Sequence, residues 1–535
     1  MTAHPPPPPD DARYLAVVAK DARFDGCFFT GVTSTGIYCR PVCRVRTPKR
    51  ENCRFFHHAA QAEQAGFRPC LRCRPELAPH TPLWTPTPGQ ALDSPAWSMQ
   101  DASRILAAQA AQLLDHPHTW CETPPSVRQL ARRLGVSDRH VRRIFEAHLG
   151  VSPLQYLQTQ RLLCAKQLLT DTPLSVTEVA ALSGFASLRR FNAAFAAHYA
   201  LNPTQLRRQG PPRAGAVARQ GIHVKLAYRP PYDVDAMLQF FATRQIPGVE
   251  DVALHATPAH PHQSLRRTLS IRSGQTLHTG WLEARFSAAP NAVGRVDLYI
   301  SESLRQVLPQ VMARVRALLD LDAEPQAINA VLHADFPTGD GLRVPGTLDG
   351  FELAVRAVLG QQITVAAART LAVRLVERFG TPVDTPFASL TRLFPSPEAL
   401  AGASGDALGQ LGIVKQRQAA IVALAQAVTH QGLSLHPGAD LPSTLAALQA
   451  LPGVGDWTAQ YIAMRALRWP DAFPSGDVAL HKALGVQGGP RAAQAAQAAS
   501  WAWQPWRSYA VLRAWATLPA KASAAAIAAA TFAIK

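Results

Sequence analysis

Two short cysteine pairs are the first residues of the chain whose types and spacing suggest chemistry. Cys39 and Cys43 form a C-x3-C pair, and Cys70 and Cys73 form a C-x2-C pair after 26 intervening residues. Each short spacing can place two ligands on one edge of a tetrahedron, and four thiolates are a ligand set that Zn²⁺ prefers. The sequence therefore predicts one zinc ion held by four cysteines.

The segment around these cysteines is strongly basic. From Arg40 to Arg74 the chain carries nine Lys/Arg and two acids. A purely structural zinc site needs no such excess, whereas a site that binds DNA phosphates does. A structural zinc with a solvated basic face is the alternative interpretation.

A second candidate site is the carboxylate of Asp477. It follows Gly455 by 22 residues, and residues 451–455 read Leu-Pro-Gly-Val-Gly, which is typical of a helix-hairpin-helix turn. Gly453 and Gly455 would allow a tight turn and present bare N–H groups to a DNA phosphate. A carboxylate nearby could stabilise the oxocarbenium-like sugar formed when a base leaves. The alternative for any single Asp beside a helix is N-capping.

Two helix-Gly-helix segments, residues 126–145 and 175–195, have apolar residues at helical spacing. The second helix of each segment exposes basic side chains: Arg139, Arg142 and Arg143 in the first, and Arg189 and Arg190 in the second. Such helices fit the major groove of DNA. A helical bundle with a solvated basic face is the alternative, which two tandem copies make weaker.

Charge and composition agree with a DNA partner, and a merely soluble basic protein is the alternative interpretation of the charge. The net charge is +17, and residues 1–210 carry 25 Lys/Arg against 15 Asp/Glu. No apolar run approaches the ~18 residues that span a membrane, and the proline-rich start has no signal core. Paired cysteines fit a reducing cytoplasm better than a disulfide framework. We therefore expect a cytoplasmic, nucleoid-associated protein without a membrane partner.

The amino-terminal segment resembles the zinc domain of the bacterial Ada regulator. Residues 35–43 read Thr-Gly-Ile-Tyr-Cys-Arg-Pro-Val-Cys, and residues 65–73 read Ala-Gly-Phe-Arg-Pro-Cys-Leu-Arg-Cys. The resemblance implies that Cys39 takes a methyl group from a methylated DNA phosphate in a single turnover. Spacing alone does not single out Cys39. A zinc bound by four thiolates carries a formal −2 charge, and methylating one leaves −1, so affinity for DNA should rise.

The next segment resembles the AraC-type regulator domain, on the residues Ala180, Gly184, Phe185, Phe191, Phe195, Asn202 and Pro203. Ada carries this domain directly after its zinc module, in the order found here. Ada normally ends with a methyltransferase domain built around a P-C-H-R motif, which this chain lacks. We therefore expect no repair of O6-methylguanine by cysteine alkylation.

Residues 226–518 resemble the AlkA family of 3-methyladenine DNA glycosylases. The matching strings are Pro-Pro-Tyr-Asp at 230–233, Leu-Arg-Val-Pro-Gly at 342–346, Ala-Val-Leu-Gly-Gln-Gln at 357–362, Leu-Gly-Ile at 411–413 and Pro-Trp-Arg-Ser-Tyr-Ala at 505–510. The resemblance places the catalytic aspartate at Asp477. It places base-stacking aromatic residues at Trp457, Tyr461, Trp515 and Phe240. Aromatic faces favour a flipped cationic alkylpurine by ~0.5–2 kcal/mol per ring; ordinary core packing is the alternative for each ring.

Two positions depart from the AlkA pattern. A second aromatic residue after the aspartate is replaced by Val478, so the pocket is expected to be wider. The wedge that fills the gap left by the flipped base falls on Gln362. Trp457 occupies the place of the lysine that forms a Schiff base in lyases of the superfamily, which predicts a monofunctional glycosylase. No four-cysteine cluster follows residue 400, which predicts no iron–sulfur cluster.

These elements predict a multidomain protein, mainly α with α+β parts. We expect a disordered start (1–10), a small zinc domain (11–78), a linker (79–100) and a tandem helix-turn-helix bundle (101–208). A second linker (209–220), an α+β subdomain (221–322), a helical helix-hairpin-helix glycosylase domain (323–520) and a tail (521–535) should follow.

The predicted function joins two activities. The zinc domain senses methylphosphotriesters and the helix-turn-helix pair activates transcription at promoters, while the glycosylase removes alkylated purines from double-stranded DNA. RNA polymerase is expected as a further partner, and the chain as a monomer. The alternative is a DNA-binding regulator whose glycosylase-like half recognises damage without catalysis, which Val478 and Gln362 make conceivable.

Overall fold

The computed structural model describes residues 10–80, 99–115, 125–209, 221–255, 262–286, 294–486 and 491–518. The predicted proline-rich start, both linkers and the tail lie largely outside these residues. The described residues fall into two compact units. The first is drawn from Met1–Pro231, Ala289–Ala313 and Leu321–Pro325, and the second from Tyr232–Ala288, Arg314–Asp320 and Gln326–Lys535. The mainly helical, multidomain fold class is confirmed.

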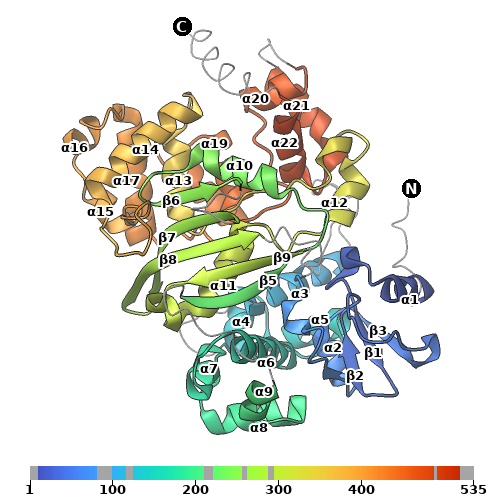
Figure 1. Cartoon of the computed structure of the whole chain (residues 1–535). Helices are drawn as coiled ribbons and strands as arrows, with labels where there is room; N and C mark the ends of the chain where they lie inside the picture. The colour runs from blue at the N-terminus through green and yellow to red at the C-terminus, as the bar shows by residue number, and fades with distance from the viewer. Residues whose placement is uncertain are drawn as a thin grey trace. The chain divides into compact units, whose positions relative to one another are not determined.

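The zinc module, the segment that contains the four clustered cysteines, is a small sheet with flanking helices (Figure 1). Its strands lie in the order β3-β1-β2-β4, and its elements are α1 (Asp10–Ala19), β1 (Phe29–Val32), β2 (Ile37–Cys39), β3 (Cys53–Phe56), α2 (Ala59–Gln64) and β4 (Arg68–Pro69). Strand β2 pairs in parallel with β4, with Tyr38 opposite Pro69. Because Cys39 and Cys70 directly follow these two residues, the pairing brings the two cysteine pairs together.

The bundle that follows contains the two predicted helix-turn-helix segments. Its helices are α3 (Met99–Asp115), α4 (Val127–Arg133), α5 (Asp138–Leu149), α6 (Pro153–Asp171), α7 (Val176–Leu182), α8 (Leu188–Tyr199) and α9 (Pro203–Gln209). Gly135 and Gly184 adopt φ values of 67° and 79° in the turns, a conformation that glycine adopts without steric cost. Ser137 and Ser187 cap the second helix of each segment.

The α+β region contributes antiparallel strands to both units. In the first unit β5 (Ile222–Ala227) pairs with β9 (Arg295–Ile300), and Val224 lies opposite Leu298. In the second unit β6 (Glu250–Ala253), β7 (Gln263–Ser273) and β8 (Thr276–Phe286) form an antiparallel meander, against which α10 (Val234–Arg244) packs.

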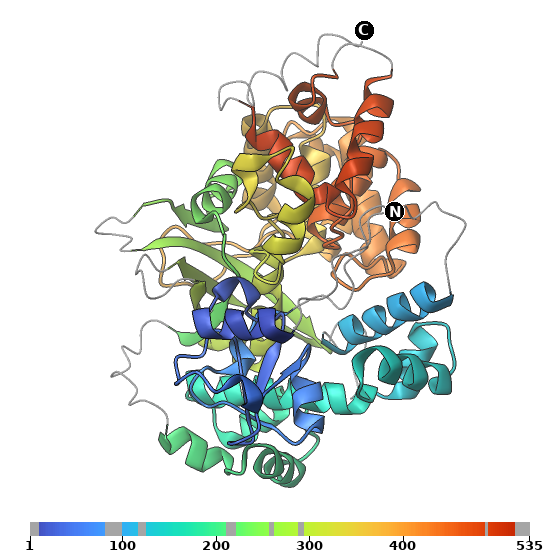
Figure 2. The same ribbon diagram turned by 90° about the vertical axis from the view of Figure 1, so that its right-hand side faces the viewer.

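The remainder is helical, as the sequence predicts. Figures 1 and 2 show its yellow, orange and red helices gathered together. The core surrounds α13, whose residues are nearly all buried and which contacts α14, α17 and α19. The helices are α11 (Leu308–Leu318), α12 (Pro325–Leu332), α13 (Gly350–Leu359), α14 (Val365–Phe379), α15 (Pro397–Ala401), α16 (Gly405–Gly409), α17 (Lys415–His430), α18 (Leu441–Gln449), α19 (Asp456–Arg465), α20 (Val478–Ala483), α21 (Ala492–Ala499) and α22 (Arg507–Ala516).

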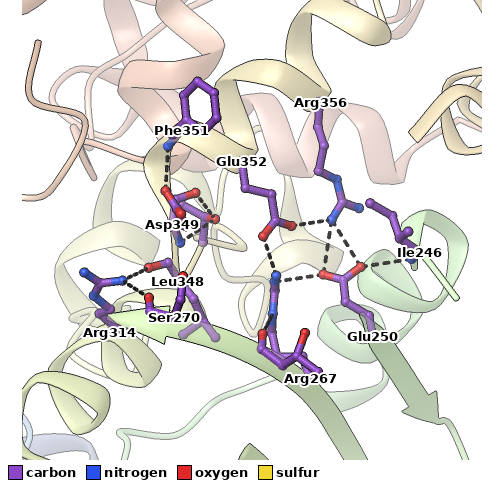
Figure 3. A network of polar contacts seen from close by, with 12 residues as sticks. Ile246, Glu250, Arg267, Ser270, Arg314, Leu348, Asp349, Phe351, Glu352 and Arg356 are labelled. Atoms are coloured by element: carbon purple, nitrogen blue, oxygen red, sulfur yellow. Dashed lines mark hydrogen bonds and ion pairs between the residues drawn. The ribbon is translucent and has the colours of Figure 1, made fainter. Parts of the chain in front are cut away.

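A buried ion network ties the meander to α13 (Figure 3). Arg267 of β7 bonds Glu250 at 2.8 Å and Glu352 at 2.6 Å, and Arg356 bonds the same two carboxylates at 3.1 and 2.9 Å. Burial alone would raise the pKa of Glu250, but Arg356 and Arg267 hold it below its ordinary value. Each buried charge thus has an opposite partner, which offsets its desolvation.

Within the described ranges, no helix is both long enough and apolar enough to cross a bilayer.

Candidate functional site

The four predicted zinc ligands converge in the zinc module. The Sγ atoms of Cys39, Cys43, Cys70 and Cys73 all lie within 4.8 Å of one another. The buried Arg40 guanidinium holds the two cysteine pairs together. It pairs with Asp25 and donates to the carbonyl oxygen of Cys73 at 3.0 Å. Four sulfur donors at these separations fit tetrahedral zinc.

The four sulfurs differ in their surroundings. Cys43 and Cys70 are buried, whereas Cys39 and Cys73 are half-buried. The backbone N–H of Arg40 donates to Sγ of Cys73 at 3.4 Å, and backbone amides also interact with Cys43 and Cys70. Exposure therefore does not single out Cys39 among the four cysteines.

The basic excess of the zinc module is smaller at its surface than the sequence count suggests. Arg40 is buried, and Arg74 pairs with Glu76 and Asp171 at 2.8 and 2.7 Å. The exposed cations include Arg46, Arg54, Arg68 and Arg72. These residues, rather than Arg40 and Arg74, can reach a phosphate.

Helix α6 contacts the zinc loop directly, which sequence reasoning missed. Lys166, only 1% exposed, donates to the carbonyl oxygen of Cys70 at 3.0 Å and to Glu76 at 2.7 Å. Glu63 of α2 accepts hydrogen bonds from Tyr38 and from Thr159 of α6. No short-range pattern in the sequence indicates these contacts, because about 90 residues separate the partners.

The predicted DNA-reading side chains lie on the exposed faces of their helices. Val141 and Phe145 of α5 are buried, so the opposite face of that helix carries its basic residues to solvent. Phe191 and Phe195 do the same for α8. The exposed side chains are Arg139, Arg142 and Arg143 on α5 and Arg189 and Arg190 on α8.

The carboxylate of Asp477 accepts hydrogen bonds from two indole groups. Trp457 Nε1 donates to Oδ2 at 2.8 Å, and Trp515 Nε1 donates to Oδ1 at 3.0 Å. The backbone N–H of Leu480 also donates to Oδ1, at 2.7 Å, so Asp477 caps α20 as well. N-capping, the alternative interpretation of Asp477, is thus confirmed, and the same carboxylate also binds two indole groups. Three donors fix the direction in which the carboxylate points.

The hairpin before α19 needs glycine at one of its two positions. Gly453 has a φ of 75°, and Ala420 and Gln416 lie close behind it. Gly455 has an ordinary φ of −89°, and a side chain there would meet open space. Gly455 thus leaves the surface at the start of α19 uncovered, as a close-approaching phosphate requires.

The predicted pocket aromatics form one cluster with Asp477. Trp457 and Tyr461 stack with their ring centres 5.3 Å apart. Arg465 donates to the Tyr461 hydroxyl at 2.5 Å and lies 4.7 Å from the ring centre of Phe240. Burial alone would raise the pKa of Tyr461, but Arg465 and Arg244 hold it below its ordinary value. Hydrogen bonds and ring contacts thus connect Asp477 with Trp457, Trp515 and Tyr461, and Phe240 lines a cavity with Arg244 and Arg465.

Two arginines of this cluster were not foreseen. Arg244 lies 3.8 Å from the ring centre of Phe240, and burial lowers its pKa to about 10. Arg465 continues the four-residue spacing of Trp457 and Tyr461 on α19, so the sequence held a signal for it. Both guanidinium groups therefore lie against the ring of Phe240.

The two positions that depart from the AlkA pattern are both exposed. Val478 is 44% exposed at the start of α20. Gln362 is exposed between α13 and α14, with a φ of 53°. Neither side chain is needed to fill the core.

Comparisons with known families agree with this organisation. Residues 12–76 match the metal binding domain of Ada, and residues 130–209 match a helix-turn-helix domain. Residues 223–349 match the AlkA N-terminal domain, and residues 355–508 match the HhH-GPD superfamily of base excision DNA repair proteins.

Individual relatives cover either the whole chain or one half of it. The chain is 34% identical to DNA-3-methyladenine glycosylase 2 of Escherichia coli, over 55% of this chain and 96% of that protein. The 3-methyladenine DNA-glycosylase of Archaeoglobus fulgidus, 18% identical, superposes with a TM-score of 0.44 over 54% of this chain and 96% of that one. The probable bifunctional transcriptional activator/DNA repair enzyme AlkA of Mycobacterium tuberculosis is 37% identical over 94% of this chain and 96% of that protein. The chain therefore belongs to the family of AlkA-type bifunctional transcriptional activators and DNA repair enzymes.

Proposed function

We propose that Asp477 and its aromatic neighbours remove alkylated purines of the 3-methyladenine type from DNA and that Cys39 accepts a methyl group from a DNA methylphosphotriester. The observation that carries the first activity is the carboxylate of Asp477, which two indole N–H groups orient beside stacked aromatic rings. A regulator that only recognised damage would need the rings but not an oriented anion.

The pocket supports hydrolysis of the N-glycosidic bond. The bond between C1′ and the purine nitrogen breaks, and its electron pair leaves with the base. The negative charge of Asp477 stabilises the cationic sugar, water adds to C1′, and the water then loses a proton. Trp457 stands where a lyase would carry a lysine, so backbone cleavage is not expected. The product is an abasic site.

The proposal of methyl transfer rests on the four-cysteine cluster and on the match to the metal binding domain of Ada. Zinc, when bound, keeps the cysteine sulfurs deprotonated at neutral pH. The Cys39 thiolate attacks the methyl carbon, an S–C bond forms, the C–O bond breaks, and the phosphate leaves as a diester anion. The match to the metal binding domain of Ada supports Cys39 as the acceptor, since its exposure does not differ from that of Cys73. The thioether that forms is stable, so each molecule reacts once.

We also predict a single zinc ion, the lack of an iron–sulfur cluster, contact with RNA polymerase, a monomeric state, a nucleoid location and the domain boundaries given above. The exposed arginines of α5 and α8 support binding of promoter DNA through the major groove. Loss of local negative charge on methylation of Cys39 would strengthen that binding.

The glycosylase proposal is tested by release of free base from methylated duplex DNA. Wild type should release 3-methyladenine, and Asp477→Asn, which keeps the side-chain shape, should release it at least ~10²–10³-fold more slowly. Chromatography of the released bases measures both rates. If neither protein released any base, the damage-recognising regulator would be the better account.

A further inference from the structure

The loop that carries Gln362 holds an unfavourable backbone conformation. Gln362 lies at a φ of 53° between α13 and α14, in the left-handed region, and its side chain is exposed. For a residue other than glycine this conformation is sterically unfavourable, and it persists only where neighbouring contacts fix it. The contacts that hold this loop therefore indicate why Gln362 is kept in this conformation.

One side chain joins this loop to the hairpin that precedes α19. Gln361 Nε2 donates to the carbonyl oxygen of Gly453 at 2.8 Å and to the hydroxyl of Thr458 at 2.9 Å. A primary amide has two N–H groups, so both of its donors are used. Gly453 occupies the centre of the hairpin turn, and the buried Thr458 directly follows Trp457. The backbone of the loop is held independently, since Arg417 of α17 donates to the carbonyl oxygen of Gln361.

We propose that Gln361 is a positioning residue that makes the wedge at Gln362 and the hairpin move as one body. The inference rests on the proposed glycosylase function. The hairpin would grip the DNA backbone, and the wedge must enter the base stack at a fixed distance from that grip. Gln361 sets this distance through two hydrogen bonds, so it acts on the displacement of a paired base and not on breakage of the glycosidic bond.

The test separates base displacement from chemistry by the choice of DNA. The variant is Gln361→Met in the full chain, which keeps the length of the side chain and removes both donors. The matched control is Gln418→Met, because Gln418 also donates to a backbone carbonyl, that of Ile413 at 2.6 Å, but contacts neither the wedge loop nor the hairpin through that amide. Single-turnover release of 3-methyladenine is measured from a paired duplex and from the same lesion in single-stranded DNA.

We expect Gln361→Met to lower the rate about tenfold on paired DNA, because two hydrogen bonds are lost, and to leave the single-stranded rate within about twofold. The control should match wild type on both. An equal loss of rate on both substrates would show a merely structural role and would overturn the proposal. No loss of rate on either substrate would also overturn it. The fluorescence of 2-aminopurine opposite the lesion measures displacement without excision, so the proposal is tested even if wild type releases no base, which would refute only the glycosylase function.

Discussion

The zinc centre and the glycosylase pocket differ in how far apart in the sequence their residues lie. All four zinc ligands come from residues 39–73, and one parallel strand pair brings them together. The pocket draws on residues from Phe240 to Trp515, which meet only when α10, α19, α20 and α22 have packed. The zinc centre therefore needs a metal ion and only a short folded segment. The glycosylase pocket needs the fold of its whole unit.

Removal of the zinc ion should have the largest effect, and it should disrupt the zinc module without disrupting the glycosylase site. Cys70→Ser removes a buried ligand, and structural zinc in small peptides contributes about 10–16 kcal/mol to folding, so the zinc module should unfold. Zinc content and hydrogen exchange of residues 10–80 measure this. Base release should stay within about twofold of wild type. Cys53→Ser, at a buried cysteine outside the cluster, should retain zinc.

The next largest effect should come from the scaffold of the pocket. Glu250→Gln leaves Arg267 and Arg356 with one fewer buried partner, which should lower the free energy of unfolding of the second unit by about 3–5 kcal/mol. Denaturant unfolding measures the change. Glu398→Gln breaks an exposed pair with Arg272 and should cost less than ~1 kcal/mol.

The same carboxylate predicts the direction of the pH dependence. The pKa of Glu250 lies below its ordinary value in the folded protein. Its contribution to stability is therefore complete above the unfolded pKa and is lost as the pH falls through the folded pKa. Stability of the second unit should decline on acidification, and less steeply in Glu250→Gln. An equal decline in both proteins would contradict this assignment.

A smaller effect on base release is expected when one hydrogen bond to Asp477 is removed. Trp515→Phe keeps an aromatic ring and removes one donor to Asp477, so single-turnover base release should fall about tenfold. Trp503→Phe is the matched control, since the Trp503 indole donates to another carboxylate, Asp335, at 2.7 Å. Its rate should stay within about twofold of wild type. Equal losses in the two variants would mean that the hydrogen bond to Asp477 has no special role.

The smallest effect is expected at the helix-turn-helix surface. Arg142→Ala on α5 removes one exposed cation, so the slope of log K against log salt for DNA binding should become less negative by about 0.9 if Arg142 contacts a phosphate. Titrations at several salt concentrations measure the slope. Arg272→Ala, at an exposed arginine of β7, should leave it unchanged.

The features that were predicted best from the sequence are those whose residues lie close together along the chain. The zinc ligands, the two helix-turn-helix segments and the hairpin glycines follow from local patterns, and the structure places each in the expected element. The partners of Asp477 needed a family resemblance, because residues 457, 477 and 515 share no local pattern. Lys166 beside the zinc loop and Gln361 beside the hairpin escaped altogether, since long-range packing alone creates their contacts.

The most direct test of the account measures both chemistries on one preparation of methylated duplex DNA. Mass spectrometry locates methyl groups on the protein, and chromatography of the same reaction quantifies free 3-methyladenine. We predict that Cys39→Ala loses protein methylation and keeps base release, and that Asp477→Asn loses base release and keeps methylation at Cys39. Loss of both activities in either variant, or of neither in both, would contradict the assignment of two separate chemistries to these two residues.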